Sequence, residues 1–287
     1  MKLGVVFPQN ESSADPGALR DYVQAVEAMG YDHLEIYDHV LGASPDRPGG
    51  WNGPYTHEHL FHEVLVTLGY LAGVTTRLEL VTAILILPQR QTALVAKQAA
   101  EVDLLSGGRL RLGVGLGWNR VEMEGLGEDY STRGRRMEEQ VALLRRLWTE
   151  PLIDFTGDFN VISNAGINPL PGRQIPIWMG GTVDAAKRRA ARLADGWMMN
   201  LPIESDPYAA LDEVRGYVAE AGREVEAFGV DVRVGVRKGV EETAQRAGAW
   251  RDRGVSHVSI NTMAAGLAWP QGHIDALKAV REVLDPS

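Results

Sequence analysis

The sequence predicts a single α/β domain, a (β/α)8 TIM barrel that spans residues 1–287. Short apolar runs rich in β-branched residues alternate with segments of helical periodicity, and most connections between them are short. Eight strand–helix alternations indicate a parallel sheet, and eight parallel strands are the number that closes a TIM barrel. An open doubly wound sheet is the alternative, but it usually carries a glycine-rich loop after its first strand. Pro8, Gln9 and Asn10 stand at that position instead.

The individual elements follow from these two periodicities. The expected strands are, in chain order, Leu3–Phe7, Leu34–Tyr37, Leu78–Leu87, Leu110–Val114, Ile175–Met179, Gly196–Met199, Val230–Val236 and His257–Ile260. The expected helices lie between and after these strands, at Asp15–Met29, Glu58–Ala72, Thr92–Leu105, Thr132–Trp148, Val183–Leu193, Pro207–Ala221, Glu241–Arg253 and Ile274–Val283.

Two connections are longer than a barrel needs, one after the second strand and one before the fifth. The first, Leu41–Thr56, is rich in Gly and Pro and carries Trp51 and Tyr55. Long loops in compact domains usually cover a binding site, so we expect this loop to be a lid. The second, Pro151–Pro171, contains a predicted hairpin that turns at residues 156–158.

Composition excludes several classes of function. The net charge is −9, from 29 basic and 38 acidic residues, and no basic run exceeds three residues, which argues against a nucleic-acid partner. The chain has no cysteine, so disulfides, thiolate metal sites and cysteine nucleophiles are excluded. The apolar run after Met1-Lys2 is too short for a signal peptide or a membrane span. We therefore expect a cytoplasmic protein with no membrane partner.

The stretch "LSGGRLRLGVGLGW" (105–118) has two glycine clusters, one on each side of the predicted fourth strand. In a TIM barrel the loops that follow the strands build the active site, and the loops that precede them stabilise the fold. Gly107 and Gly108 precede the strand and are expected only to turn the chain. Gly115, Gly117 and Trp118 follow it and are expected to face a ligand.

Two further segments end predicted strands on the same face. Asp38 and His39 follow the second strand, where an imidazole can point at a ligand, although a simple strand-end cap explains the pair equally well. Gly180, Gly181 and Thr182 follow the fifth strand, with Thr182 as the expected N-cap of the next helix. Backbone N–H groups at such a helix start can hold a phosphate, which we favour over an ordinary turn.

The segment "THEHLFHE" (56–63) offers a metal-site alternative. His59 and Glu63 are four residues apart and could chelate a divalent cation. The pattern is not H-E-x-x-H, however, and a solvated helix start explains it better. We therefore expect no metal site there.

Four segments together carry a family resemblance: "YDHV" (37–40), "VTAILILPQRQTALVAKQAAEVDLLSGGRLRLGVGLGWNRVEMEGLG" (81–127), "RGRRMEEQVALLRRLW" (133–148) and "PIWMGGTVDAAKRRAARLADGW" (176–197). They resemble the luciferase-like monooxygenase superfamily, and within it the branch of deazaflavin (coenzyme F420)-dependent oxidoreductases. The resemblance implies a bacterial-luciferase-like barrel, a cofactor ring at the carboxyl ends of the strands, and a homodimer.

The resemblance also implies roles for individual residues. It implies a bulge with a non-prolyl cis peptide in the third strand, matched here by Thr82, Ala83 and Ile84, with Ile84 against the back of the ring. The remaining positions match as follows: Asp38 and His39 lie near ring and substrate, Gly115 and Gly117 let the backbone approach the cofactor, Trp118 and Asn119 line its side chain or the substrate pocket, and Gly180, Gly181 and Thr182 hold a phosphate.

One departure from the family pattern concerns the proton donor. The sugar-phosphate dehydrogenase branch places a carboxylate directly after its G-x-G, whereas this chain has Trp118 there and Glu122 four residues later. A sugar-phosphate substrate is therefore not expected. Leu85, Leu87, Trp51 and Trp118 suggest an apolar pocket instead, and Asn200, Arg237, Lys238 and Asn261 are candidates from the late strands.

The resulting hypothesis is an F420-dependent oxidoreductase that transfers a hydride between the deazaflavin C5 and a small organic substrate, with His39 as the polar catalytic group. The nearest alternative is an FMN-dependent two-component monooxygenase on the same fold, which needs a flavin reductase partner. A metal-dependent barrel hydrolase that uses His39, His57 and His59 is a more distant alternative. A non-catalytic flavin-binding protein is the last, because a barrel alone does not imply turnover.

Overall fold

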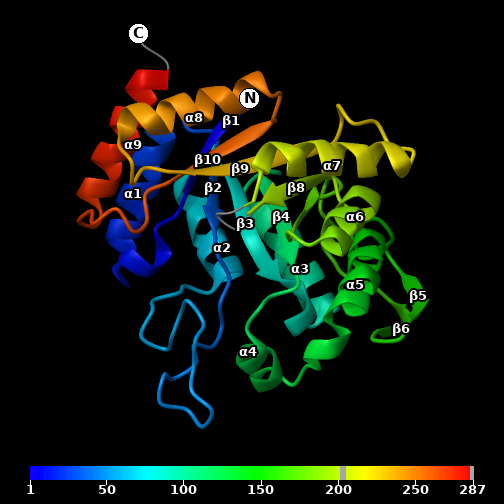
Figure 1. Cartoon of the computed structure of the whole chain (residues 1–287). Coiled ribbons are helices and arrows are strands. Elements are labelled where there is room, and N and C mark those ends of the chain that lie inside the picture. Colours follow the sequence, from blue (N-terminus) through cyan, green and yellow to red (C-terminus); the bar gives the residue numbers. More distant parts are fainter. Residues whose placement is uncertain (201–204, 285–287) are drawn as a thin grey trace.

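A computed structural model describes residues 1–200 and 205–284 of the chain and confirms the predicted barrel. All neighbouring strands are parallel, and they close in the order β1-β10-β9-β8-β7-β4-β3-β2 (Figure 1). The strands are β1 (Lys2–Val6), β2 (His33–Ile36), β3 (Glu79–Ile86), β4 (Leu110–Gly115), β7 (Ile177–Gly180), β8 (Gly196–Met199), β9 (Gly229–Gly235) and β10 (His257–Asn261).

Helices surround the barrel. One short helix, α4, was not predicted, and the others agree with the predicted ones to within a few residues, except at the start of α2. The helices are α1 (Pro16–Ala28), α2 (Val64–Val74), α3 (Thr92–Leu105), the short α4 (Arg120–Gly125), α5 (Arg133–Leu147), α6 (Asp184–Leu193), α7 (Pro207–Glu220), α8 (Val240–Asp252) and α9 (Gln271–Leu284). In the described part of the chain, none of them is long and apolar enough to cross a membrane.

The prediction that a helix starts at Glu58 was wrong. The Glu63 side chain caps α2 by accepting the Val66 N–H at 2.7 Å, so the helix begins at Val64. Residues 57–62 therefore belong to the loop that follows β2, which lengthens the predicted lid. The second insertion is confirmed: β5 (Ile153–Thr156) and β6 (Val161–Ala165) form an antiparallel hairpin outside the barrel (Figure 1).

The prediction that Gly107 and Gly108 turn the chain is confirmed in the loop between α3 and β4. Gly107 and Gly108 have φ angles of 70° and 85°, a region that residues with a Cβ rarely adopt. They lie at the amino-terminal end of the barrel, away from the loops that follow the strands.

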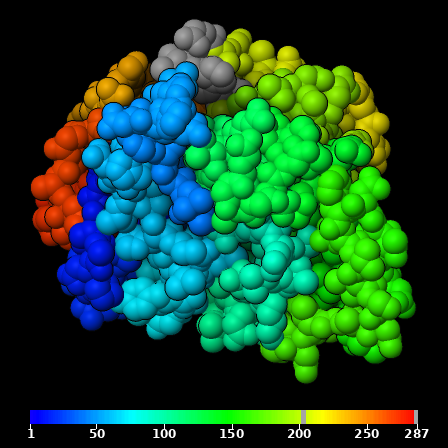
Figure 2. All heavy atoms as spheres, turned by 90° about the horizontal axis from the view of Figure 1, so that it is seen from below, coloured from blue at the N-terminus to red at the C-terminus, as the bar shows by residue number. Residues whose placement is uncertain are grey.

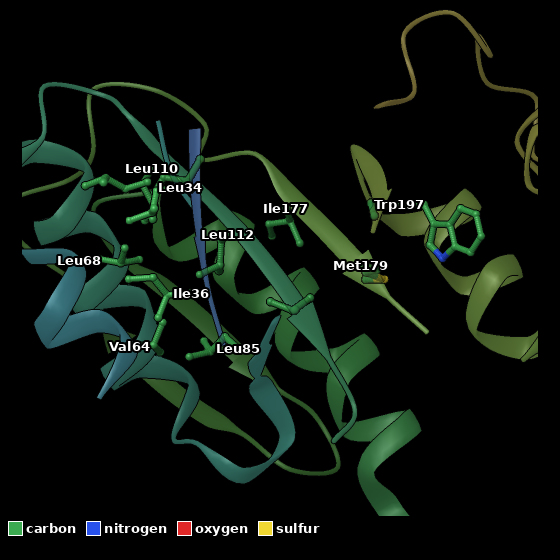
Figure 3. Close-up of a cluster of buried hydrophobic side chains, with 14 of the residues drawn as sticks. Leu34, Ile36, Val64, Leu68, Leu85, Leu110, Leu112, Ile177, Met179 and Trp197 are labelled. Atoms are coloured by element: carbon green, nitrogen blue, oxygen red, sulfur yellow. The ribbon is translucent and has the colours of Figure 1, made fainter. Parts of the chain in front are cut away.

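The main apolar core lies between the strands and the helices rather than inside the barrel. Leu34 and Ile36 on β2 pack toward Val64 and Leu68 on α2, and all four side chains are buried (Figure 3). The cluster continues around the barrel through residues such as Leu110, Leu112, Ile177, Met179 and Trp197. Successive strand residues point to opposite faces, so the residues between these positions point into the barrel.

Much of the barrel interior is polar and charged. Arg233 donates from Nε to Glu35 Oε2 at 2.8 Å. Arg111 donates from Nη1 to Asp231 Oδ2 at 3.0 Å, and His33 Nε2 lies 3.3 Å from the same oxygen. Buried charges are tolerated only when they are paired and hydrogen-bonded, so these pairs constrain where each strand can lie.

Glycines make room for the ring side chains in this interior. A Cβ at Gly4 would lie 2.1 Å from His33 Nε2, and a Cβ at Gly229 would lie 2.2 Å from the Trp178 ring. Both distances are far below van der Waals contact, so these strands approach the rings only because the side chain is absent.

The interior histidine His257 gives stability a pH dependence. Burial is the main cause that lowers the pKa of His257 to about 2, and the charge of Arg111 acts in the same direction. The unfolded chain therefore takes up a proton on His257 near pH 6.5 that the folded chain does not take up. This contribution is present above pH 6.5 and is lost as the pH falls, by up to about 1.4 kcal/mol per pH unit.

We expect the free energy of unfolding to decrease between pH 6.5 and pH 5 and the decrease to be smaller in His257→Gln. Urea denaturation at several pH values measures both slopes. Asp231 adds no slope in this range, because the His33 and Arg111 charges outweigh burial and leave its pKa well below the usual range. An equal slope in the two proteins would contradict the assignment.

Candidate active site at the carboxyl end of the barrel

Two cavities open where the strands end, and they meet. The inner cavity, about 250 Å³, is lined by Tyr37, Asp38, His39, Tyr55, Ile86 and the shared residues. The long cavity, about 440 Å³, runs past Gly115, Tyr130 and Arg133 to Gly180, Gly181 and Thr182. Both are also lined by Ala83, Ile84, Gly117, Trp118, Asn200 and Arg233. We call the place where these six residues lie the junction.

Figure 2 looks onto this end of the barrel. The loop after β2, in blue, and the region of α4, in green, lie side by side across it. The two segments are joined by Asn119, whose Nδ2 donates to the Leu41 carbonyl at 3.3 Å. A third space, the loop cavity, also about 250 Å³, lies under the loop between His39, Phe61 and Asn119.

The bulge expected in the third strand is present. The Ala83–Ile84 peptide is cis, and the pairing of β3 with β4 shifts register between Thr82 and Leu85. Ala83 and Ile84 both line the junction. Thr82 is fully buried, donates from Oγ1 to the Gly113 carbonyl at 2.7 Å, and lines neither cavity.

The glycines at the end of β4 and just after it line the cavity, and close packing against β3 also requires glycine at these positions. A Cβ at Gly115 would lie 2.6 Å from Ile84 Cδ1, and one at Gly117 would lie 2.6 Å from Ile86 Cγ2. The side chains of Ile84 and Ile86 on β3 thus occupy the space that a side chain at either glycine would need. The prediction that Leu85 and Leu87 line the pocket was wrong, because both are fully buried in the core between strands and helices.

Asp38 has its hydrogen-bonding capacity taken up by protein groups. Its carboxylate accepts the Ile86 N–H at 2.9 Å and two N–H groups of Arg90, at 2.7 and 3.3 Å. Arg90 also donates to Glu63 at 2.8 Å. The ion pair therefore ties the end of β2 to the bulge and to the end of the lid loop, which makes Asp38 a positioning residue.

His39 is held by Glu122, a residue that the sequence indicated only as a displaced carboxylate. His39 Nδ1 lies 3.0 Å from Glu122 Oε2. The other carboxylate oxygen accepts the backbone N–H of Val40 and the Gln89 side-chain amide, the latter at 3.2 Å. Glu122 comes from α4, which the sequence analysis did not predict.

The charge of Glu122 determines which nitrogen of His39 carries the proton. Burial acts to raise the pKa of Glu122, but the hydrogen bonds from His39 and Val40 outweigh it and leave the pKa lowered. An ionised carboxylate only accepts hydrogen bonds, so neutral His39 carries its proton on Nδ1. Nε2 has no partner among the described residues and keeps its lone pair for a ligand in the cavities.

Aromatic rings surround His39 on the lid side. The centroids of Tyr55, Phe61 and Trp118 lie 5.3, 4.8 and 5.5 Å from the centroid of the His39 ring. Trp51 contacts this cluster from outside it: its ring lies 5.8 Å from that of Trp118, and its Nε1 donates to the Tyr55 carbonyl at 2.8 Å. These rings fix the imidazole and separate the inner cavity from the loop cavity.

Asn119 lines the loop cavity and also caps a helix. Its side chain caps α4 by accepting the Glu122 N–H at 3.2 Å. The residue therefore sets where the helix begins and, with it, where Glu122 lies.

The part of the long cavity near the start of α6 suits an anion. Gly181 and Thr182 line it, Gly180 lies against Ile84 of the bulge, and Arg133, whose Nε has no partner among the described residues, lines the same cavity. The N-cap of α6 is Val183 rather than the predicted Thr182, and it provides no side-chain cap. The first N–H groups of α6 are thus open to an anion, as the helix dipole favours.

The structure does not assemble the histidines of the metal-site alternative. Among the described residues, the one group of His, Asp and Glu side chains close enough to share a cation is His33, Glu35 and Asp231 inside the barrel. His39 is bonded to Glu122, and His57 and His59 are exposed on the lid loop. The positively charged Arg111 and Arg233 also lie against the interior group.

Of the candidates from the late strands, Asn200 lines the junction, whereas Arg237, Lys238 and Asn261 line neither cavity. Sequence reasoning missed Arg233, which reaches the junction from β9. The signal was present in the alternation of Asp231, Val232, Arg233 and Val234, which places charged residues on the inner face of a strand.

Comparison with known proteins agrees with this architecture. An uncharacterised protein of Mycobacterium tuberculosis (strain ATCC 25618 / H37Rv) is 39% identical over 61% of this chain and 62% of its own length. The FMNH2-dependent dimethylsulfone monooxygenase of Pseudomonas fluorescens (strain Pf0-1) is 32% identical over 98% of this chain and 76% of its own length. The F420-dependent glucose-6-phosphate dehydrogenase of Segniliparus rotundus is 29% identical over 69% of this chain and 56% of its own length.

Among solved structures, an F420-dependent secondary alcohol dehydrogenase in complex with an F420–acetone adduct superposes with a TM-score of 0.77 at 16% identity, over 99% of this chain and 100% of that chain. At this identity the likeness supports the fold alone. The sequence model of the luciferase-like monooxygenase family matches residues 1–285. The chain therefore belongs to the luciferase-like monooxygenase family of oxidoreductases, whose members include both F420-dependent and FMN-dependent enzymes.

Proposed function

We propose that this protein is an F420-dependent oxidoreductase that transfers a hydride between the deazaflavin C5 and a small organic substrate. The observation that carries the proposal is the His39–Glu122 pair beside the junction, because exchange between an alcohol and a carbonyl moves one proton together with each hydride. The long cavity supports a cofactor with a ring at one end and a phosphate at the other, between the Ala83–Ile84 bulge and Arg133.

The residues divide the work as follows. When bound, the deazaflavin ring supplies or accepts the hydride. In alcohol oxidation, His39 Nε2 accepts the hydroxyl proton while the hydride leaves the carbinol carbon, so the product is a carbonyl compound. In the reverse direction, protonated His39 donates to the oxygen. Glu122 keeps Nε2 directed at the substrate and stabilises the imidazolium that forms.

An FMN-dependent two-component monooxygenase is the second candidate. A specific observation favours it, since the Pseudomonas fluorescens relative is FMNH2-dependent and the match covers 98% of this chain. In that reaction a flavin reductase would be the partner that supplies reduced FMN. The two candidates share the same cavities and differ in the cofactor.

Cofactor binding separates the two candidates. We expect the protein to bind F420 at least tenfold more tightly than FMN, because the hydride-transfer proposal requires the deazaflavin. Titration of each cofactor into the protein, followed by cofactor fluorescence, measures both dissociation constants. A preference for FMN would transfer the assignment to the monooxygenase reaction.

If Arg133 contacts the phosphate of the cofactor, a variant of Arg133 should weaken binding of the phosphate and not of the ring. Loss of one charge-assisted hydrogen bond costs about 1.5–3 kcal/mol, so Arg133→Gln should weaken binding of the phosphate-containing cofactor roughly 10- to 100-fold. The same change should leave the affinity for the phosphate-free ring (riboflavin, or the deazaflavin chromophore alone) unaltered. Arg135→Gln is the matched control, because Arg135 is exposed and does not line the cavity. Equal weakening of both ligands would contradict a phosphate contact.

The His39–Glu122 pair predicts a change of tautomer. We expect ¹⁵N NMR at pH 8 to show His39 protonated on Nδ1, and Glu122→Ala to shift the proton to Nε2, which solvent-exposed histidines favour. Cofactor affinity should remain within twofold of wild type, whereas turnover should fall by about 10²–10⁴ because Nε2 no longer accepts a proton. An unchanged tautomer in Glu122→Ala would remove Glu122 from the mechanism.

A further inference from the structure

We propose that Arg233 binds a negatively polarised oxygen at the junction, where cofactor and substrate meet. The inference deepens the proposed function and rests on it. It concerns a charged residue of the barrel interior that the sequence analysis did not name.

The position of Arg233 singles it out. Hydride transfer requires donor and acceptor carbons within about 3–3.5 Å, so the reacting atoms must lie where the two cavities join. Of the six residues at the junction, Ala83, Ile84, Gly117, Trp118 and Asn200 are uncharged, and Arg233 alone carries a charge. It is thus the cation closest to the place where charge develops during the reaction.

The guanidinium is fixed on two sides and available on the third. Nε donates to Glu35 at 2.8 Å, and Nη2 donates to the Ala83 carbonyl, in the cis peptide of the bulge, at 3.1 Å. Nη1 has no acceptor among the described residues. The side chain is 14% exposed, and its guanidinium carbon lies 5.2 Å from the centre of the Tyr37 ring. A group held in this way donates a hydrogen bond without losing much conformational freedom.

Of the Arg233–Glu35 ion pair, only the positively charged Arg233 faces the cavities. Glu35 is fully buried and lines neither cavity, so it lies on the interior side of Arg233. The two other carboxylates near the inner cavity are already engaged, Asp38 by Arg90 and Glu122 by His39. A ligand oxygen at the junction therefore meets Arg233 without competition from a free carboxylate among the described residues.

The ligand chemistry is a carbonyl or anionic oxygen, which has two sources. One is the carbonyl oxygen on the pyrimidine end of the cofactor ring, where reduction increases the negative charge. The other is the substrate oxygen, on which negative charge grows when a hydride reaches the adjacent carbon. In both cases Arg233 stabilises the charged form more than the neutral one, as electrostatic catalysis requires.

The experiment uses Arg233→Gln together with the double variant Arg233→Gln/Glu35→Gln, since removing Arg233 alone leaves a buried carboxylate without its partner. Arg237→Gln is the matched control, because Arg237 lies two residues after the end of the same strand, is exposed and lines neither cavity. Circular dichroism establishes that each variant is folded. The cofactor is whichever of F420 and FMN the wild type binds more tightly.

Two measurements distinguish the sources. If Arg233 binds the ring, the midpoint potential of the bound cofactor without substrate should fall by about 30 mV, a tenfold change for a two-electron couple. If Arg233 binds the substrate, the potential should stay constant, and the affinity of the cofactor-loaded protein for benzoate, an oxyanion probe, should fall about tenfold. The double variant should reproduce either change, and Arg237→Gln should show neither.

A potential and a benzoate affinity that both equal those of wild type, in folded variants, overturn the inference while the proposed function stands. Failure of the wild type to bind either cofactor overturns the proposed function itself, and the inference with it. The two failures are thus separated by the wild-type titration alone.

Discussion

The pairing of charges inside the barrel is the constraint on which the rest of the structure depends. Arg111 and Arg233 are matched with Asp231 and Glu35 from strands on different sides of the interior. A shift of one residue in the register of β2 or β9 would turn these charges toward the apolar layer between strands and helices, away from the opposite charges that now pair with them. Such pairs add little net stability compared with apolar packing, because desolvation offsets their attraction. Their effect is positional, since they select one register and bring Arg233 to the floor of the cavities.

The lid loop is fastened to this barrel at both of its ends. Arg90 joins Asp38, at the end of β2, to Glu63, at the start of α2. Glu122 binds the backbone at Val40 and the His39 side chain near the beginning of the same loop. The groups that position the imidazole are therefore the groups that anchor the lid. A movement of the anchored ends of this loop would alter the direction of His39 Nε2, on which the proposed proton transfer depends.

The sequence was sufficient for the barrel, because alternating apolar runs and helical segments depend on local periodicity. It also indicated the faces of the glycine clusters and the place of the cis peptide at Ala83–Ile84, the latter from the family resemblance. It could not show that His39 bonds to Glu122, since these residues are 83 positions apart and meet only through α4. Nor did it reveal Arg233, because alternating charges on a buried parallel strand contradict the usual apolar pattern of such strands.

The position of the carboxylate has a chemical consequence. A carboxylate directly after G-x-G would stand on the cavity wall, where Trp118 stands in this chain, and could act on a ligand itself. Glu122 is instead buried behind His39, with no place on the wall of either cavity. Any effect of Glu122 on a ligand there must therefore pass through the imidazole. The wall of the inner cavity beside His39 carries the rings of Trp118 and Tyr55, whereas Phe61 lines the loop cavity. One segment, 115–122, thus places the ring of Trp118 on the cavity wall and keeps the carboxylate of Glu122 behind His39, where a ligand in either cavity does not meet it directly.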